Sequence, residues 1–149
     1  MSATPTTPAT PTAPAATVPL TTEDAETLLD AARGAAEAAG TTVSVTVLDA
    51  GGHLLAFRRD DRAVLVSGET STRKAFTALQ LNAPTAEADA VLAGLPLHTL
   101  PTALDRPLLF IAGGLPVHRA GRLVGAIGVG GGAPAQDHEF AAAALAALA

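Results

Sequence analysis

Lys74 is the residue whose type and setting most directly suggest chemistry. It lies in an otherwise apolar, alanine-rich stretch, Lys74-Ala75-Phe76-Thr77-Ala78. A partly buried amine can anchor an anion, donate a proton or form an imine with a carbonyl compound. A structural salt bridge to Glu69 or Asp137 is an equal alternative. Arg73 points about 100° away on a helix, so it shares a ligand with Lys74 only if the pocket wraps around that helix.

The four histidines are the second set of candidates, because the sequence has no Cys or Tyr and its single Met is the first residue. Haem iron is usually held by one of these residue types, so a strong axial ligand here must be a histidine. His98, in a segment punctuated by prolines, is the predicted metal ligand and a candidate for proton transfer. Its alternative is a loop histidine bonded to backbone. His53, His118 and His138 are expected to be solvated, and no pair has the spacing of a zinc site.

Two glycine clusters, Gly113-Gly114 and Gly130-Gly131-Gly132, would let a planar or anionic ligand approach the backbone closely. The second cluster precedes a helix expected from Pro134, and the amides at a helix N-terminus favour anions. The alternative for both clusters is a tight turn at positive φ. The predicted ligand site comprises residues from the glycine clusters, the Lys74 helix and the later segments: Arg73, Lys74, His98, Gly113, Gly114, Gly131, Gly132 and Asp137.

The elements that must position these residues follow from periodicity and turn signals. Thr21 and Asp24 form a capping-box variant that opens a helix, and Gly40 ends it. Alternation of β-branched and polar residues predicts strands, and spacing of three and four predicts helices. Helices are expected over 21–39, 67–80, 85–93 and from 134 onward, and strands over 42–47, 53–59, 108–112, 115–119 and 122–130. This order predicts an α+β fold with an antiparallel sheet.

Composition limits the class of protein. Residues 1–19 alternate Pro, Thr and Ala and are expected to form a disordered arm before one domain over 20–149. The net charge of −5 and the absence of a Lys/Arg cluster in the sequence argue against a nucleic-acid partner. No apolar run is long enough to span a membrane, and the arm lacks the features of a secretory signal. A cytoplasmic location is therefore expected.

Three segments taken together resemble the GlcG/HbpS-like family, which also occurs as the C-terminal domain of PduO-type proteins. They are Val47-Leu48-Asp49-Ala50-Gly51-Gly52-His53-Leu54, the Lys74 stretch, and the segment from Gly113 through Gly121–Val129 to Gln136-Asp137. The resemblance implies a profilin-like fold with a five-stranded antiparallel sheet, homo-oligomerisation and, in several members, binding of haem or corrinoid-related ligands. Where relatives commonly read Gly-Val-Ser-Gly-Gly, this chain has Gly130 in place of Ser, and Arg73 replaces a more usual acidic residue.

Two functions from different classes follow. The first is a small-ligand-binding protein whose ligand is haem or another compact organic molecule. The alternative is a cofactor-free isomerase, cyclase or lyase, in which Lys74 or His98 moves a proton and glycine-loop amides stabilise an oxyanion. A third possibility is an interaction module whose oligomer is the function. The first two depend on a cavity where the Lys74 helix, the His98 segment and the glycine turns converge.

Overall fold

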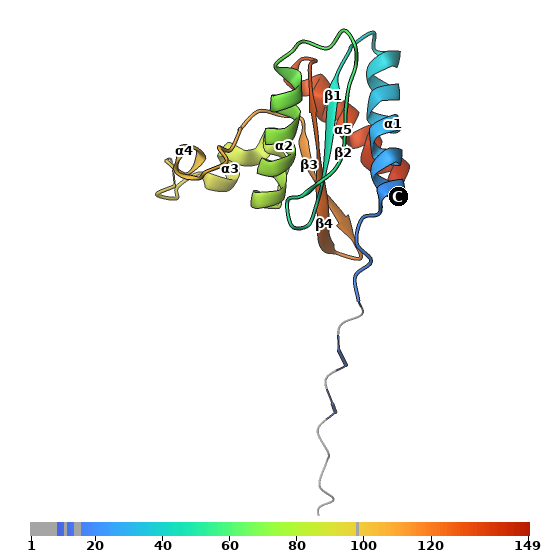
Figure 1. The fold of residues 1–149 in the computed structure, drawn as a ribbon. Helices are drawn as coiled ribbons and strands as arrows, with labels where there is room; N and C mark the ends of the chain where they lie inside the picture. The colour runs from blue at the N-terminus through green and yellow to red at the C-terminus, as the bar shows by residue number, and fades with distance from the viewer. Residues whose placement is uncertain (1–8, 11, 14–15, 98) are drawn as a thin grey trace, which may run out of the picture.

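One antiparallel sheet of four strands organises the fold in the computed structural model, which describes residues 9–10, 12–13, 16–97 and 99–149. The strand order is β2-β1-β4-β3 (Figure 1). The strands are β1 (Ser44–Asp49), β2 (Leu54–Arg59), β3 (Gly114–Arg119) and β4 (Arg122–Gly130). β1 and β2 form the predicted hairpin, and β1 also pairs with β4.

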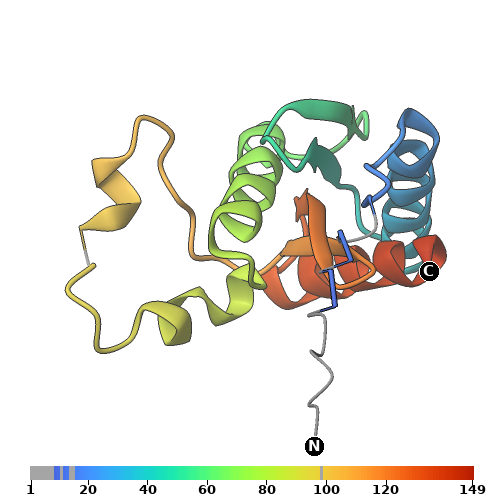
Figure 2. The ribbon, with the colours of Figure 1, turned by 90° about the horizontal axis from the view of Figure 1, so that it is seen from below.

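Helices cover both faces of this sheet. α1 (Thr22–Ala38) and α5 (Pro134–Leu148) lie on one face and α2 (Ser67–Leu81) on the other (Figure 2). The 3₁₀ turn η1 (Thr85–Glu87) and the short helices α3 (Ala88–Leu92) and α4 (Leu100–Ala103) extend to one side beyond α2. The predicted α+β class is confirmed. Over the described part of the chain, no helix has both the length and the apolar character needed to cross a bilayer.

The two faces of the sheet pack differently. Towards α1 and α5, strand residues such as Val45, Val47 and Ile127 form an apolar core with Leu28 and Phe140. Towards α2 the contacts are small and partly polar: Ser44 and Thr46 exchange side-chain hydrogen bonds with Ser67 (2.8 Å) and Ser71 (2.9 Å). Small residues on both sides bring the α2 backbone close to the sheet, and this closeness fixes the position of Lys74.

The prediction of a fifth strand over 108–112 is wrong, because this segment is irregular in the structure. Its amides find partners elsewhere: Leu109 N donates to Thr77 Oγ1 on α2 (2.8 Å), and Leu108 N donates to the Pro101 carbonyl (3.0 Å). β3 is therefore an edge strand among the described residues, and Pro116 in it has no N–H to offer a further strand. The profilin-like classification and the domain boundaries stay predictions.

The capping box predicted at the start of α1 is confirmed, and it gives a first testable expectation. Thr21 N donates to Asp24 Oδ2 (2.9 Å) and Asp24 N donates to Thr21 Oγ1 (3.1 Å), while Arg119 on β3 also donates to Asp24 (3.1 Å). The hydrogen bond from the Thr21 amide holds the pKa of Asp24 below its ordinary value of 3.8.

Replacing Asp24 with Ala is expected to lower the free energy of unfolding by about 1 kcal/mol at neutral pH. Because the folded-state pKa is depressed, this stability is present above pH 3.8 and is lost as the pH falls through the folded pKa. Urea denaturation across this pH range measures both effects. Glu23→Ala, a neighbouring acidic residue in the same turn, is the control. A loss at Asp24 no larger than at Glu23 would contradict the capping role.

Candidate functional site

Lys74 and Asp137 form a buried ion pair between α2 and the first turn of α5. The two residues are 3% and 1% exposed. Lys74 Nζ donates to Asp137 Oδ2 (2.7 Å) and to the Val129 carbonyl (3.0 Å). Of the two salt bridges that the sequence allowed, the one to Asp137 is present, whereas Glu69 pairs with Arg73 (2.7 Å).

The buried setting of the pair affects the ionisation of Asp137. Burial raises the pKa of Asp137, against the hydrogen bonds from Lys74 Nζ and the Gly132 amide, which lower it. A carboxyl with a raised pKa beside an amine is a pair between which a proton can move when a ligand changes their surroundings.

Gly113 and Gly114 enclose the ion pair but face no open space. A Cβ atom at Gly113, where φ is +130°, would lie 2.9 Å from both Lys74 Cδ and Asp137 Cβ. The Gly114 amide donates to Thr85 Oγ1 (2.9 Å), and a Cβ at this position would clash with the Lys74 carbonyl. These two glycines are therefore needed for close packing around the Lys74 stem. Gly113 also has the positive φ that the turn interpretation expected, and ligand contact at both glycines stays a prediction.

A hollow of about 210 Å³ opens beside the ion pair. Its polar side is formed by Lys74, Asp137, Ser67, Thr70, Gly131 and Gly132, and its apolar side by Val64, Val66, Ile111 and Pro134. Val64 and Val66 are each 56% exposed and Ile111 is 40% exposed. The hollow thus combines a buried charged pair with an exposed apolar rim.

Two backbone amides just before α5 already donate to side chains of the protein. Gly132 N donates to Asp137 Oδ1 (2.9 Å), and Ala133 N donates to Gln136 Oε1 (3.1 Å). The protein's own carboxylate and amide thus occupy the amides that precede α5. Any oxyanion-stabilising role for these two groups requires Asp137 or Gln136 to move.

Gly130 stands where the resemblance suggested a serine, and the hydroxyl of Thr70 on α2 lies next to this position. A Cβ atom at Gly130 would clash with Thr70 Oγ1 and lie 2.9 Å from the Ser67 carbonyl. Thr70 lines the hollow and donates to Ser67 O (3.2 Å). The wall of the hollow therefore has a hydroxyl from α2 beside Gly130, the position on β4 where the resemblance suggested a serine.

Arg73, a predicted ligand-binding residue, is not brought to this hollow. Arg73 is partly exposed and borders a separate hollow of about 390 Å³ with Phe76 and Arg106, whose guanidinium lies 4.1 Å from the Phe76 ring centroid. His98 lies outside the described residues, so its predicted metal and catalytic roles stay predictions. Within the described chain, no group of three or more His, Cys, Asp or Glu is arranged to hold a metal.

The other three histidines have distinct settings. The His53 side chain is 81% exposed beside Asp49, and His118 is exposed with Nε2 2.7 Å from Asn82 Oδ1. These two are accessible, as expected. His138 differs, because its Nδ1 is buried and has no hydrogen-bond partner among the described residues.

The apolar side of the hollow was missed by sequence reasoning, which assigned no role to residues 63–66. The signal was present in the run Ala63-Val64-Leu65-Val66, which has no helical or strand period and directly precedes the helix. Ile111 was assigned to the strand over 108–112. Its actual place in an irregular segment lets it reach the hollow.

Comparison with known proteins agrees with this architecture. The family model described as haem-degrading protein HbpS-like matches residues 20–146. The chain belongs to the HbpS-like family. It is 39% identical over 104 residues to a 15.0 kDa protein encoded in the dhaT-dhaS intergenic region of Citrobacter freundii, covering 69% of this chain and 73% of that protein.

Two solved structures of this family are similar along most of their length. A double mutant of HbpS from Streptomyces reticuli is 36% identical, with a TM-score of 0.80 over 97% of this chain and 99% of that one. The complex of PduOC with haem is 34% identical, with a TM-score of 0.80 over 87% of this chain and 95% of that one. The predicted family resemblance is confirmed.

Proposed function

We propose that this HbpS-like protein binds a compact organic ligand in the hollow beside Lys74 and Asp137. The polar end of the ligand faces the ion pair and its apolar body lies against Val64, Val66 and Ile111. The observation that carries the proposal is a charged pair, almost fully buried, at the base of a hollow with an exposed apolar rim. Binding sites characteristically combine apolar walls with a few placed polar groups.

Haem is the first ligand to test, because PduOC is known as a complex with it. The described lining residues fit the organic part of such a ligand: an amine for an anionic substituent and apolar side chains for a ring edge. They include no histidine, Cys, Met or Tyr, so they do not supply an iron ligand of the usual kind. His98 stays the predicted axial ligand. The hollow is also below the roughly 300–1,000 Å³ usual for small-molecule sites, so a ligand as large as haem would extend beyond it.

Titration with haemin, followed in the Soret region, tests the proposal. We expect a saturable spectral change with the natural protein and binding weakened about tenfold in Ile111→Asp, which puts a charge on the apolar rim. Val91→Asp is the matched control, because Val91 on α3 is 41% exposed and Ile111 is 40% exposed. His98→Ala is expected to shift the Soret maximum if His98 is the iron ligand.

Equal haemin binding by Ile111→Asp and the natural protein would place the ligand elsewhere. If the natural protein gave no saturable spectral change, haem would be excluded as the ligand. The proposal would then depend on other compact ligands. Thermal denaturation with and without each candidate ligand would test these, because a ligand that binds the folded state raises Tm.

The alternative of a cofactor-free enzyme is supported by one feature, the raised pKa of Asp137 beside the Lys74 amine. In that function Asp137 and Lys74 pass a proton to or from a bound carbonyl compound. Once a substrate is known, Asp137→Asn, measured where the variant remains folded, should lose the ionisation of Asp137 from the pH profile of kcat. An unchanged pH profile would contradict the catalytic role of Asp137, and ligand binding would then be the only proposed function.

We also propose that the chain acts as a homo-oligomer in the cytoplasm. The support is the consecutive exposed apolar side chains before α2, with Leu65 81% exposed between Val64 and Val66. Exposed apolar clusters of this kind mark association surfaces more often than monomer surface. Light scattering of the purified protein measures the oligomer size, and a monomer at all concentrations would contradict this proposal.

A further inference from the structure

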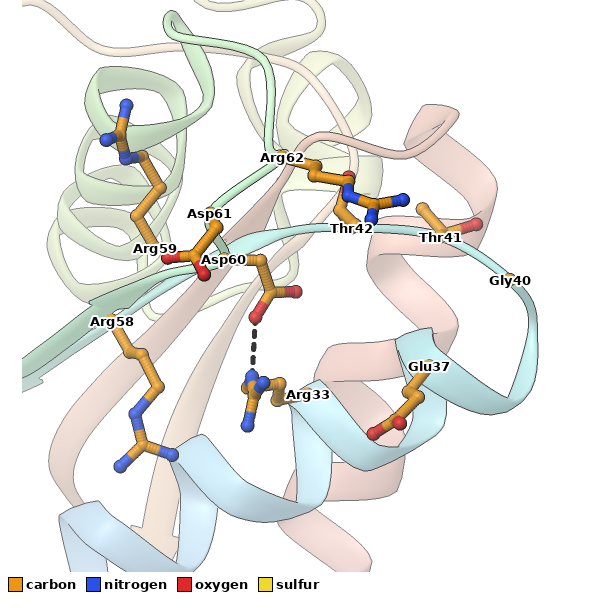
Figure 3. A pocket seen from close by; sticks show the side chains of 10 residues that line it. All are labelled: Arg33, Glu37, Gly40, Thr41, Thr42, Arg58, Arg59, Asp60, Asp61 and Arg62. Carbon is orange, nitrogen blue, oxygen red and sulfur yellow. Dashed lines mark hydrogen bonds and ion pairs between the residues drawn. The ribbon is translucent and has the colours of Figure 1, made fainter.

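A second hollow, of about 720 Å³, lies at the C-terminal end of α1. Its walls come from three segments: the last turns of α1, the link Gly40-Thr41-Thr42 leading to β1, and residues 58–62 at and beyond the end of β2 (Figure 3). We call this hollow the arginine cleft, because Arg33, Arg58, Arg59 and Arg62 line it.

The fold concentrates positive charge at this place. The chain has nine Lys and Arg residues in total and a net charge of −5, yet four of those nine line the arginine cleft. Arg33 is brought there by α1 and the other three by the β2 end. Three acidic residues, Glu37, Asp60 and Asp61, also line it, and Arg58 pairs with Asp30 and Glu26 on α1, so the positive charge that is not paired within the described chain lies on Arg59 and Arg62.

Two of the four arginines are occupied by the protein itself. Arg33 Nε donates to Asp60 Oδ1, and Asp60 Oδ2 accepts from the Val43 amide (3.0 Å), which fixes this carboxylate against β1. Arg58 donates to Asp30 (2.6 Å) and Glu26 (3.2 Å) on α1. Both carboxylate oxygens of Asp60 therefore accept hydrogen bonds from the protein, and these bonds hold the wall of the cleft in place.

The other donors have no such partners. Within the described chain, neither Arg59 nor Arg62 takes part in an ion pair. The hydroxyls of Thr41 and Thr42 make no side-chain hydrogen bond to the described residues. The Arg62 side chain extends towards Thr41 and Thr42 in the view of Figure 3, and these three residues line the same cleft.

We infer that the arginine cleft is a binding site for a small oxyanion, a phosphate ester or a polycarboxylate. Arg62 and the hydroxyls of Thr41 and Thr42 donate to its oxygens, since a guanidinium presents paired N–H groups that match phosphate and carboxylate geometry. Arg33, paired with Asp60, lies on the opposite side of the cleft (Figure 3). Glu37, on the α1 wall, opposes the anion and limits how much charge the site accepts. This inference does not depend on the hollow beside Lys74.

Isothermal titration with pyrophosphate and, separately, with citrate at fixed ionic strength tests the inference. We expect saturable binding of at least one of them, weakened about tenfold or more by Arg62→Gln. Glu37→Gln should bind about threefold more tightly, because it removes a like charge. Arg122→Gln is the matched control: Arg122 is exposed, forms no ion pair with described residues and is not part of the cleft.

The outcomes separate the sources of the anion. Binding of pyrophosphate alone assigns a phosphate ester, and binding of citrate alone assigns a polycarboxylate. Saturable binding of neither would overturn the inference. Equal weakening by Arg62→Gln and Arg122→Gln would also overturn it, because the anion would then respond to overall charge and not to this cleft. Ile111→Asp should leave anion binding unchanged, so this test is independent of the haemin titration.

Discussion

Replacing Lys74 with Met is expected to lower the free energy of unfolding by about 3–5 kcal/mol. The substitution retains the length of the stem but leaves the Asp137 carboxylate buried without its charged partner, with Gly132 N as its remaining hydrogen-bond donor. A buried, unpaired carboxylate is costly because the interior solvates it poorly. Urea denaturation at neutral pH measures the loss.

The neighbouring residue provides a matched control for this effect. Arg73 forms an ion pair with Glu69 at the same 2.7 Å, but the two side chains are 40% and 63% exposed, against 4% and 1% for Lys74 and Asp137. Arg73→Met should therefore change stability by less than about 1 kcal/mol. The double variant Lys74→Met/Asp137→Leu should recover a large part of the loss, because no buried charge remains. Losses of equal size at Lys74 and Arg73 would show that burial of the pair is not what matters.

The pairing of Lys74 with Asp137 also marks how far sequence reasoning reaches. The helix containing Lys74 and the helix containing Asp137 follow from local signals, namely periodicity, proline and capping residues. Their side chains are 63 positions apart, and only packing of α2 and α5 against opposite faces of one sheet brings them together. The sequence therefore allowed two ion-pair partners for Lys74, and the fold brings Asp137, not Glu69, into contact with it.

The errors in the sequence predictions also arise from contacts between elements that are distant in the sequence. Residues 108–112 have a strand-like local pattern, but the Leu109 amide donates to Thr77 on α2 and not to a neighbouring strand. The arginine cleft is the opposite case. No Lys/Arg cluster was expected from the sequence, yet Arg58, Arg59 and Arg62 lie within five residues of one another, and the fold adds Arg33, which meets Asp60, 27 positions away. Local pattern predicts elements, whereas sites made across elements depend on contacts that no local pattern encodes.

Replacing Gly128 with Ala is expected to destabilise the protein by about 3 kcal/mol or more, at the upper end of what overpacking usually costs. Gly128 lies on β4 beneath α2, and an added Cβ would lie 2.6 Å from Ala75 N and 3.0 Å from Ala75 Cβ and would clash with the Ser71 carbonyl. These are mainly backbone atoms of a helix, so no side-chain rotation relieves the contact. α2 as a whole must move away from the sheet.

This movement should also be felt at the hollow, because Lys74 precedes Ala75 on the same helix. Gly128→Ala is therefore expected to weaken ligand binding even at temperatures where the variant remains folded, a loss measured by the haemin titration beside urea denaturation. Gly34→Ala is the control, since Gly34 is an exposed position within α1 with nothing within 4 Å of an added Cβ. It should stabilise the protein by about 0.5–1 kcal/mol. If Gly128→Ala were as well tolerated as Gly34→Ala, α2 would not be held against the sheet closely enough to fix Lys74, and the hollow would lose its structural basis.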